Sequence, residues 1–271
     1  NLDLLATSHE HKGQMRKAEE LLRQATAIPA LTEYQEYMQK SLAVFLLGRQ
    51  RWRDAIAAAK VLSNGKSATT RTVGHAFEGH AYLALRNMAA ARKAMAAAQA
   101  ELQAIPVLTA GITVNRAAVK PYVDALQAEM LLREGKIEEG SVLSKDVQAR
   151  LRALPGPDAW TQALFRLEAF ARTARATGAW DLAEHTARQM IDHDAAYAGS
   201  HLALALVAHQ RGNDELARTE AEAARKYWQD ADANLKELGE LRTLEARLRD
   251  ESSPRLAHSK NTLSSSSLPS H

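Results

Sequence analysis

The sequence contains no cysteine, which excludes disulfide bonds, thiolate nucleophiles and cysteine-ligated zinc sites. Proteins without cysteine occur in the cytoplasm and among exported proteins, so both the cytoplasm and the periplasm stay open as the compartment. Aromatic residues make up only 5% of the chain, and this scarcity disfavours β-sheets, in which aromatic side chains are enriched. The absences therefore favour a protein that is held together by non-covalent contacts and has little sheet.

The chain also lacks a long apolar run and a strong excess of one charge. No apolar stretch approaches the roughly 18 residues that a membrane-spanning helix needs, so we expect no membrane insertion. Lysine and arginine number 35 against 32 aspartate and glutamate residues, and no block of basic residues stands out. Because nucleic-acid binding needs a basic patch or stripe, we expect no nucleic-acid partner.

Alanine is abundant and makes up about a fifth of the 271 residues. It is the strongest helix former, whereas the residues that interrupt helices are few, with 7 prolines and 13 glycines. Apolar residues reach 46%, which is enough to bury a sizeable core. We therefore expect an all-α protein.

One pattern recurs along the chain: an apolar-periodic segment, a short turn, and a second segment that opens with small and charged residues. The turns are expected at Gly13, Gly48, Arg86-Asn87, Gly135, Gly178 and Gly212. Seven residues before the turns stand Ala6, Ser41, Gly79, Ala128, Ala171 and Ala205. Small residues also follow the turns, at five residues in every unit except the second, where the spacing is seven. They are Ala18, Ala55, Ala91, Gly140, Ala183 and Ala217. Since antiparallel helices joined by a short turn approach most closely at small residues, the pattern predicts six helix pairs.

The third unit reads Gly79-His80-Ala81-Tyr82, followed by Leu85 and Ala91. With this spacing the chain resembles the tetratricopeptide repeat family, whose units are helix pairs of about 34 residues. The resemblance covers about residues 1–230. It implies a right-handed superhelical solenoid of about six pairs, with a concave groove lined by the first helix of each pair.

The array is expected to occupy residues 1–251. Two intervals between units are longer than the family period, which predicts insertions near 106–119 and 153–159. The strong helix formers of 214–250 predict a capping helix at the end of the array. Residues 252–271 hold eight serines, two prolines and no acid, so we expect a disordered tail there.

The beginning of the array shows no comparable cover. Leu2, Leu4 and Leu5 belong to the first helix of a unit that begins almost at Asn1. Because the open end of a repeat array exposes apolar surface, we expect further repeats or another domain before Asn1, with the protein as part of a larger chain or assembly.

Motifs that carry chemistry are incomplete. Gly65-Lys66-Ser67 lacks the earlier glycine of a phosphate-binding loop, and His9-Glu10-His11 lacks the second histidine of a zinc protease. Asp192-His193-Asp194 is the most metal-like cluster, but such residues in a loop commonly cap helices. No nucleophile elbow is present. We therefore expect a non-enzymatic protein without cofactor or metal.

Candidate binding residues come from the groove that the resemblance implies. Counting back from each turn in helical steps selects Met38, Phe45, His80, Leu83, Tyr122, Glu129, Phe165, Arg172, Arg175 and His209. We expect apolar anchors near Phe45, Leu83 and Tyr122, and an acidic group near Arg172 and Arg175, because paired guanidinium groups suit carboxylates. The alternatives are packing between repeats for the apolar residues and a solvated helix face for the two arginines.

Three functions compete at this level. The first is an interaction scaffold that binds a peptide or protein partner in its groove. The second is a ligand-sensing or regulatory domain of a larger protein. The third, an enzyme or metal protein built on the Asp192-His193-Asp194 cluster, has the weakest support from the sequence.

Overall fold

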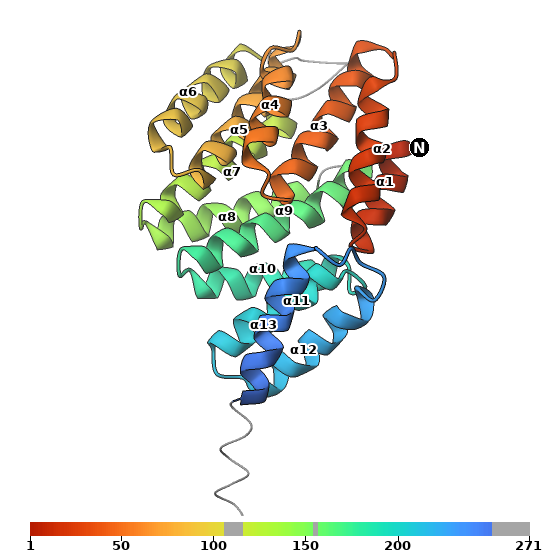
Figure 1. Cartoon of the computed structure of the whole chain (residues 1–271). Coiled ribbons are helices and arrows are strands. Elements are labelled where there is room, and N and C mark those ends of the chain that lie inside the picture. Colours follow the sequence, from red (N-terminus) through yellow and green to blue (C-terminus); the bar gives the residue numbers. More distant parts are fainter. Residues whose placement is uncertain (106–115, 154–156, 251–271) are drawn as a thin grey trace, which may run out of the picture.

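The computed structural model describes residues 1–105, 116–153 and 157–250, and within these ranges it is all-α, with thirteen helices and no strand (Figure 1). The helices are α1 (Leu2–His11), α2 (Met15–Ala27), α3 (Thr32–Gly48), α4 (Trp52–Ser63), α5 (Ala68–Ala84), α6 (Met88–Ala104), α7 (Arg116–Arg133), α8 (Ile137–Arg152), α9 (Pro157–Ala176), α10 (Trp180–His193), α11 (Ala198–Gln210), α12 (Asp214–Tyr227) and α13 (Lys236–Asp250). Neighbouring helices pack against one another along the chain, as in a helical repeat. The expected all-α class is confirmed.

The turns within the six pairs share one backbone feature, a residue in the left-handed region. These residues are Gly13 (φ 74°), Gln50 (φ 58°), Arg86 (φ 59°), Gly135 (φ 82°), Gly178 (φ 75°) and Gly212 (φ 75°). The expected turn at Gly48 was wrong, because Gly48 is the last residue of α3 and Gln50 makes the turn. With Gln50 as the reference, Ala55 follows at five residues and the fully buried Ala43 precedes at seven, in place of Ser41.

Short polar side chains cap the first turn of three helices, namely Ser67 for α5, Asn87 for α6 and Asn213 for α12. Asn87 follows the left-handed Arg86, and its side chain accepts a hydrogen bond from the N–H of Ala90 at the start of α6. Asn213 caps α12 in the same way after Gly212. A left-handed residue followed by an asparagine cap therefore ends one helix and starts the next within two residues.

The small residues on either side of a turn serve different contacts. A Cβ atom on Gly140, five residues after its turn, would lie 2.8 Å from Leu132 Cγ in α7, the partner helix of the same pair. A Cβ atom on Gly79, seven residues before its turn, would lie 2.3 Å from Leu126 Cδ2, which also belongs to α7. Since Gly79 lies in α5, it spaces neighbouring units. The expectation that Gly79 marks the closest approach of α5 and α6 was wrong.

Replacing Gly79 with alanine is expected to lower the free energy of unfolding by about 1–3 kcal/mol, because the fully buried Leu126 has no free space to move into. Denaturation in urea measures this loss. Gly48→Ala is the matched control, since a Cβ atom there meets nothing within 4 Å. Equal stability of the two variants would contradict the packing of α5 on α7.

The two ends of the helical array contact each other (Figure 1). The carbonyl oxygen of Gly13, in the turn between α1 and α2, accepts a 3.0 Å hydrogen bond from the N–H of Asp232. The Asp232 carboxylate accepts a 2.9 Å hydrogen bond from the N–H of Arg16, and Trp228 packs against the same turn. The connection between α12 and α13 therefore covers part of the first unit. The first unit, which the sequence predicted to be an open end of the array, is therefore covered at this turn. Leu4 in α1 stays 51% exposed.

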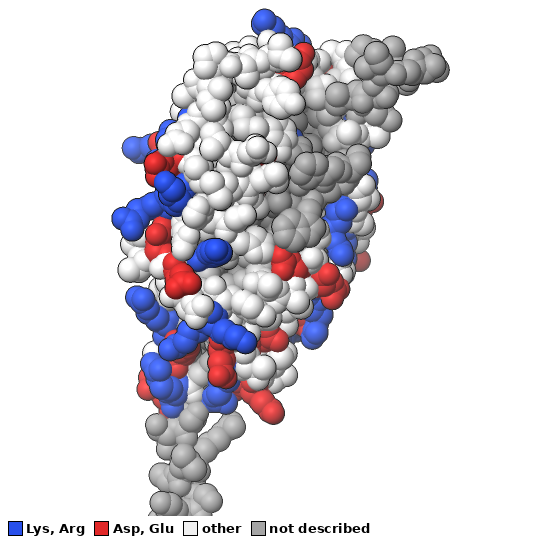
Figure 2. All heavy atoms as spheres, turned by 90° about the vertical axis from the view of Figure 1, so that its right-hand side faces the viewer, with Lys and Arg blue, Asp and Glu red and all other residues white. Residues whose placement is uncertain are grey.

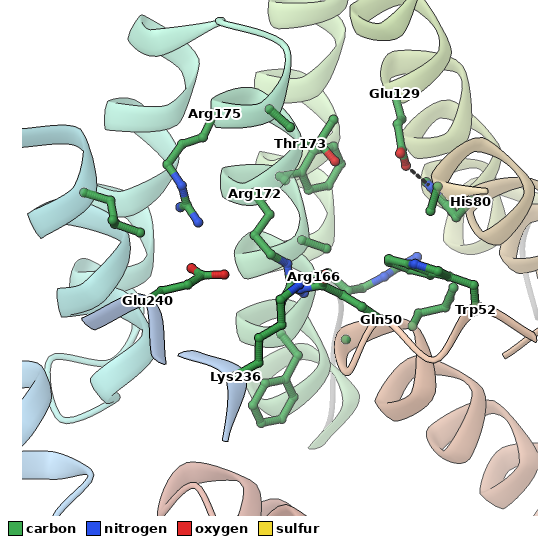
Figure 3. Close-up of a pocket in the computed structure, with 18 of the residues that line it drawn as sticks. Gln50, Trp52, His80, Glu129, Arg166, Arg172, Thr173, Arg175, Lys236 and Glu240 are labelled. Atoms are coloured by element: carbon green, nitrogen blue, oxygen red, sulfur yellow. Dashed lines mark hydrogen bonds and ion pairs between the residues drawn. The ribbon is translucent and has the colours of Figure 1, made fainter. Parts of the chain in front are cut away.

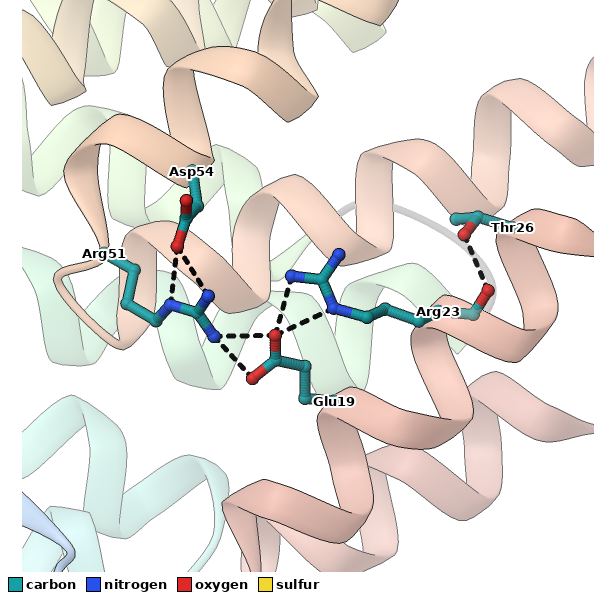
Figure 4. Close-up of polar contacts among 5 residues, drawn as sticks. All are labelled: Glu19, Arg23, Thr26, Arg51 and Asp54. Carbon is teal, nitrogen blue, oxygen red and sulfur yellow. Dashed lines mark hydrogen bonds and ion pairs between the residues drawn. The ribbon is translucent and has the colours of Figure 1, made fainter.

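An ion-pair cluster on the outer face joins α2 to α4 (Figure 4). The guanidinium of Arg51 donates hydrogen bonds of 2.6 Å to both carboxylate oxygens of Glu19 and one of 2.8 Å to Asp54. Arg23 donates to the same Glu19 carboxylate from one helical turn further along α2. These side chains are partly exposed, so solvent and salt weaken each pair.

Several expectations fall partly or wholly outside the described residues. The tail at 252–271 does so, as do positions 106–115 and 154–156 of the expected insertions. Of the remaining positions, 116–119 belong to α7, Ala153 follows the end of α8, and 157–159 belong to α9. No described helix is long and apolar enough to cross a membrane.

Charged side chains on one face of the molecule are of mixed sign. Figure 2 shows Lys and Arg interspersed with Asp and Glu over the lower part of this face, and a largely uncharged upper part. This mixture agrees with the small net charge of +3. The absence of a nucleic-acid partner stays a prediction.

Candidate ligand-binding cavity

A cavity of about 950 Å³ lies between the first helices of five pairs and the last helix (Figure 3). Its wall contains residues from α3, α5, α7, α9 and α11, and α13 contributes from Lys236 to Arg247. Trp52 and Trp180, the first residues of α4 and α10, also line it. Each pair presents the same helix inward because the turns repeat at the same place in each unit. The repeat thus brings together side chains that are far apart in the sequence.

Six of the ten candidate residues line this cavity, namely His80, Glu129, Phe165, Arg172, Arg175 and His209. Met38 and Phe45 do not, because they were counted back from Gly48. Counting three and six residues back from the true turn at Gln50 gives Leu47 and Val44, which do line the cavity. Phe45 is instead buried, at 3% exposure.

Leu83 and Tyr122 are core residues, so the expected apolar anchors of the groove need correction. Leu83 packs with Leu126 and Met95 in a cluster between the third and fourth units. The ring of Tyr122 lies 5.9 Å from that of Phe77, and the guanidinium of Arg166 lies 3.9 Å above it. The alternative of packing between repeats therefore describes both residues.

Other aromatic residues supply the apolar part of the wall. They are Trp52, Phe77, Phe165, Phe170 and Trp180. Two of them have a sequence signal, since Trp52 and Trp180 each stand two residues after the left-handed turn residue of their unit. Counting back from each turn could not select these tryptophans, because both follow their turns in the sequence.

Glu129 is held by two neighbours in the cavity wall. Its Oε2 atom lies 2.6 Å from Nδ1 of His80, and its Oε1 atom accepts a 2.7 Å hydrogen bond from Arg133 (Figure 3). Burial alone raises the pKa of the Glu129 carboxyl, but the hydrogen bond from His80 and the charge of Arg133 outweigh burial and lower this pKa below its usual range. Glu129 is therefore an ionised carboxylate whose partners are already in place.

Cations outnumber carboxylates in the wall. Its charged residues are Arg133, Arg166, Arg172, Arg175, Lys236 and Arg247, against Glu129 and Glu240. Because Glu129 is paired with Arg133, Glu240 is the one remaining carboxylate among the described lining residues. The positively charged side chains of the wall outnumber the negatively charged ones, which favours anionic ligands.

Arg172 and Arg175 differ in their surroundings. The Arg172 guanidinium lies 3.5 Å from Glu168 and 3.3 Å from Glu237, so two carboxylates neutralise it. Arg175 forms no hydrogen bond or ion pair with the described residues. Burial lowers the pKa of Arg175, and the charge of Glu240 opposes this shift. The two arginines therefore do not form the expected equivalent pair.

A buried charge network lies behind the Arg172 side of the cavity. Arg49, at the end of α3, lies 3.1 Å from Glu237 in α13 and 3.8 Å from Glu168 in α9. The hydroxyl of Tyr197 donates a 2.7 Å hydrogen bond to Glu168. Burial is the main cause that raises the pKa of Tyr197, so this hydroxyl keeps its proton. The network joins α3, α9 and α13, which are distant in sequence.

The metal-like cluster serves a structural contact. Asp194 lies 3.1 Å from Nε2 of His11, which connects α1 to the segment between α10 and α11. Its other carboxylate oxygen accepts a hydrogen bond from the N–H of Ala196. Among the described residues no group of three or more His, Asp or Glu side chains is placed to hold a metal ion.

The chain matches no protein-family model and no curated protein sequence. The resemblance to tetratricopeptide repeats therefore rests on the spacing of small residues and on the six helix pairs.

Proposed function

We propose that the helix pairs form a right-handed superhelical solenoid of the tetratricopeptide type, and that the protein is a non-enzymatic scaffold that holds a peptide segment of a protein partner in its central cavity. The observation that carries this proposal is that the wall is built in the same way by five units. In each of them the first helix lines the cavity with the residue that stands six positions before the turn. Repeat arrays use such inward faces for extended ligands.

The composition of the wall supports a ligand with both apolar and polar groups. Binding cavities of several hundred Å³ combine apolar side chains with a few polar groups that fix orientation. Here Trp52 and Trp180, which are partly exposed, supply apolar surface, while Gln50 and Thr173 supply uncharged polar groups (Figure 3). A peptide segment with apolar side chains and polar backbone groups fits this mixture.

Filling the cavity with a tryptophan tests the proposal. Peptides are selected from a displayed random library with the parent protein, and their affinities are measured by calorimetry. Ala169→Trp, in the cavity wall, is expected to weaken the selected peptides by about tenfold or more, because the new side chain occupies the site. Ala57→Trp, on the exposed face of α4, is the matched control and is expected to leave affinity unchanged. Equal binding to both variants would place the peptides elsewhere.

A ligand-sensing role is the second candidate, and Arg172 favours it. This residue lines the cavity and also pairs with Glu237 of α13, so a ligand that contacts Arg172 would change how α13 is held. Hydrogen exchange in α13 tests this role. If a small ligand changes the hydrogen exchange of α13 and no selected peptide does so, the result would favour a sensing role over a scaffold role.

A further inference from the structure

Arg175 is a charged side chain in the cavity without a charged partner in contact. It is only partly exposed, and it makes no hydrogen bond or ion pair within the described part of the chain. Removing a guanidinium from water costs free energy unless a carboxylate or another acceptor compensates for it. Within the described part of the chain, no carboxylate in contact compensates for this charge.

The surroundings of Arg175 suit an anion that comes from outside the chain. Figure 3 shows Arg175 of α9 and Glu240 of α13 directed toward the same space. Glu240 makes no ion pair with it, while Arg247 adds positive charge to the same cavity. An incoming carboxylate would meet a free guanidinium and one competing carboxylate.

We infer that Arg175 is the anion-binding residue of the cavity, and that the bound peptide segment carries an Asp or Glu side chain whose carboxylate pairs with it. This inference rests on the proposed function and specifies the chemistry of its ligand. A guanidinium binds a carboxylate through two parallel N–H···O bonds, which fixes the orientation of the peptide. Trp180 and Leu206, which line the cavity with Arg175, offer apolar contact to the residues beside the acid.

Arg172 has a structural role in this arrangement. Glu168 and Glu237 already neutralise it, so its loss leaves two buried carboxylates with less compensation. Without peptide, Arg172→Gln is expected to lower the melting temperature. Arg175→Gln is expected to leave the melting temperature unchanged or to raise it, since no ion pair is lost and a costly charge is removed.

The test uses the library-selected peptides and versions of them in which Asn and Gln replace Asp and Glu. Arg175→Gln is expected to weaken the binding of each acidic peptide by about tenfold to a hundredfold. The Asn and Gln versions of these peptides are expected to bind the parent protein more weakly by the same factor. Glu240→Gln is expected to strengthen acidic peptides, because a competing charge disappears. Arg242→Gln, on the exposed face of α13, is the matched control and should change nothing.

The outcomes separate this inference from the proposed function. Peptides that lose affinity for Ala169→Trp but contain no acid, or that bind Arg175→Gln as tightly as the parent, overturn the inference and leave the scaffold proposal standing. Peptides that bind Ala169→Trp like the parent, or failure to select any peptide, overturn both. A melting temperature lowered by Arg175→Gln as much as by Arg172→Gln also overturns the inference, because Arg175 would then stabilise the fold.

Discussion

Arg49→Met is expected to lower the free energy of unfolding by about 3–5 kcal/mol, the range found when one partner of a buried ion pair is removed. The Arg49 side chain is 12% exposed and lies 3.1 Å from Glu237 and 3.8 Å from Glu168, whose side chains are each 7% exposed. Oε2 of Glu237 is buried and has no hydrogen-bond partner among the described residues. Without Arg49, Arg172 would be left to compensate for both carboxylates. Urea denaturation monitored by circular dichroism measures the loss.

Arg51→Met is the matched control, two residues further along the chain. Arg51 pairs with Glu19 and Asp54, but its side chain is 41% exposed, and exposed pairs contribute about 1 kcal/mol or less (Figure 4). Adding Glu237→Gln to Arg49→Met should recover part of the lost stability, because it removes an uncompensated carboxylate. Similar losses for the two single variants would contradict the burial of Arg49.

The all-α fold class and most turn positions of the repeats could be predicted from the sequence, because they depend on residues that are close together along the chain. Alanine-rich helices and glycines in left-handed turns are encoded within a few residues, and four of the six turns use glycine in this way. The turn at Gln50 could not be found by the same rule, since glutamine there pays a conformational cost that the sequence does not signal. Because the turn residue is Gln50 and not Gly48, counting back from Gly48 was two residues out of register and wrongly assigned Met38 and Phe45 to the groove.

The closure of the array could not be predicted, because it depends on contacts between distant segments. The hydrogen bond from Arg16 to Asp232 joins residues 216 positions apart. The same closure brings α13 to the cavity and buries Glu237 beside Arg49. From the sequence, Arg172 and Arg175 looked equivalent, although Glu168 stands four residues before Arg172 on the same helix. The position of α13 then adds Glu237 as the second partner of Arg172.

Glu10 lies close to this buried network, and the pKa of its carboxyl is strongly shifted. The side chain comes from α1, and the residue is 7% exposed. Burial raises the pKa of the Glu10 carboxyl from 4.5 to about 8; the charge of Arg49 lowers it, and that of Glu168 raises it further. The folded protein therefore holds a proton on Glu10 at neutral pH, whereas the unfolded chain does not.

This difference predicts that the protein loses stability as the pH rises. The contribution of protonated Glu10 is fully present below about pH 4.5, decreases above it, and is lost as the pH passes the folded pKa of about 8. Its size is on the order of 4 kcal/mol. Glu10→Gln keeps the shape of the side chain without its titration, so the variant should match the parent near pH 5 and exceed it in stability at pH 9.

Urea denaturation at pH 5, 7 and 9 measures both curves, and their difference isolates Glu10 from other groups that titrate over the same range. Glu33→Gln, on the exposed face of α3, is the control and should follow the parent at every pH. A Glu10→Gln variant that loses as much stability as the parent between pH 5 and 9 would show that Glu10 is ionised in the folded protein. Arg49 would then face three ionised carboxylates, those of Glu10, Glu168 and Glu237, rather than two, and the loss expected for Arg49→Met would be larger than stated above and nearly the same at pH 5 and pH 7.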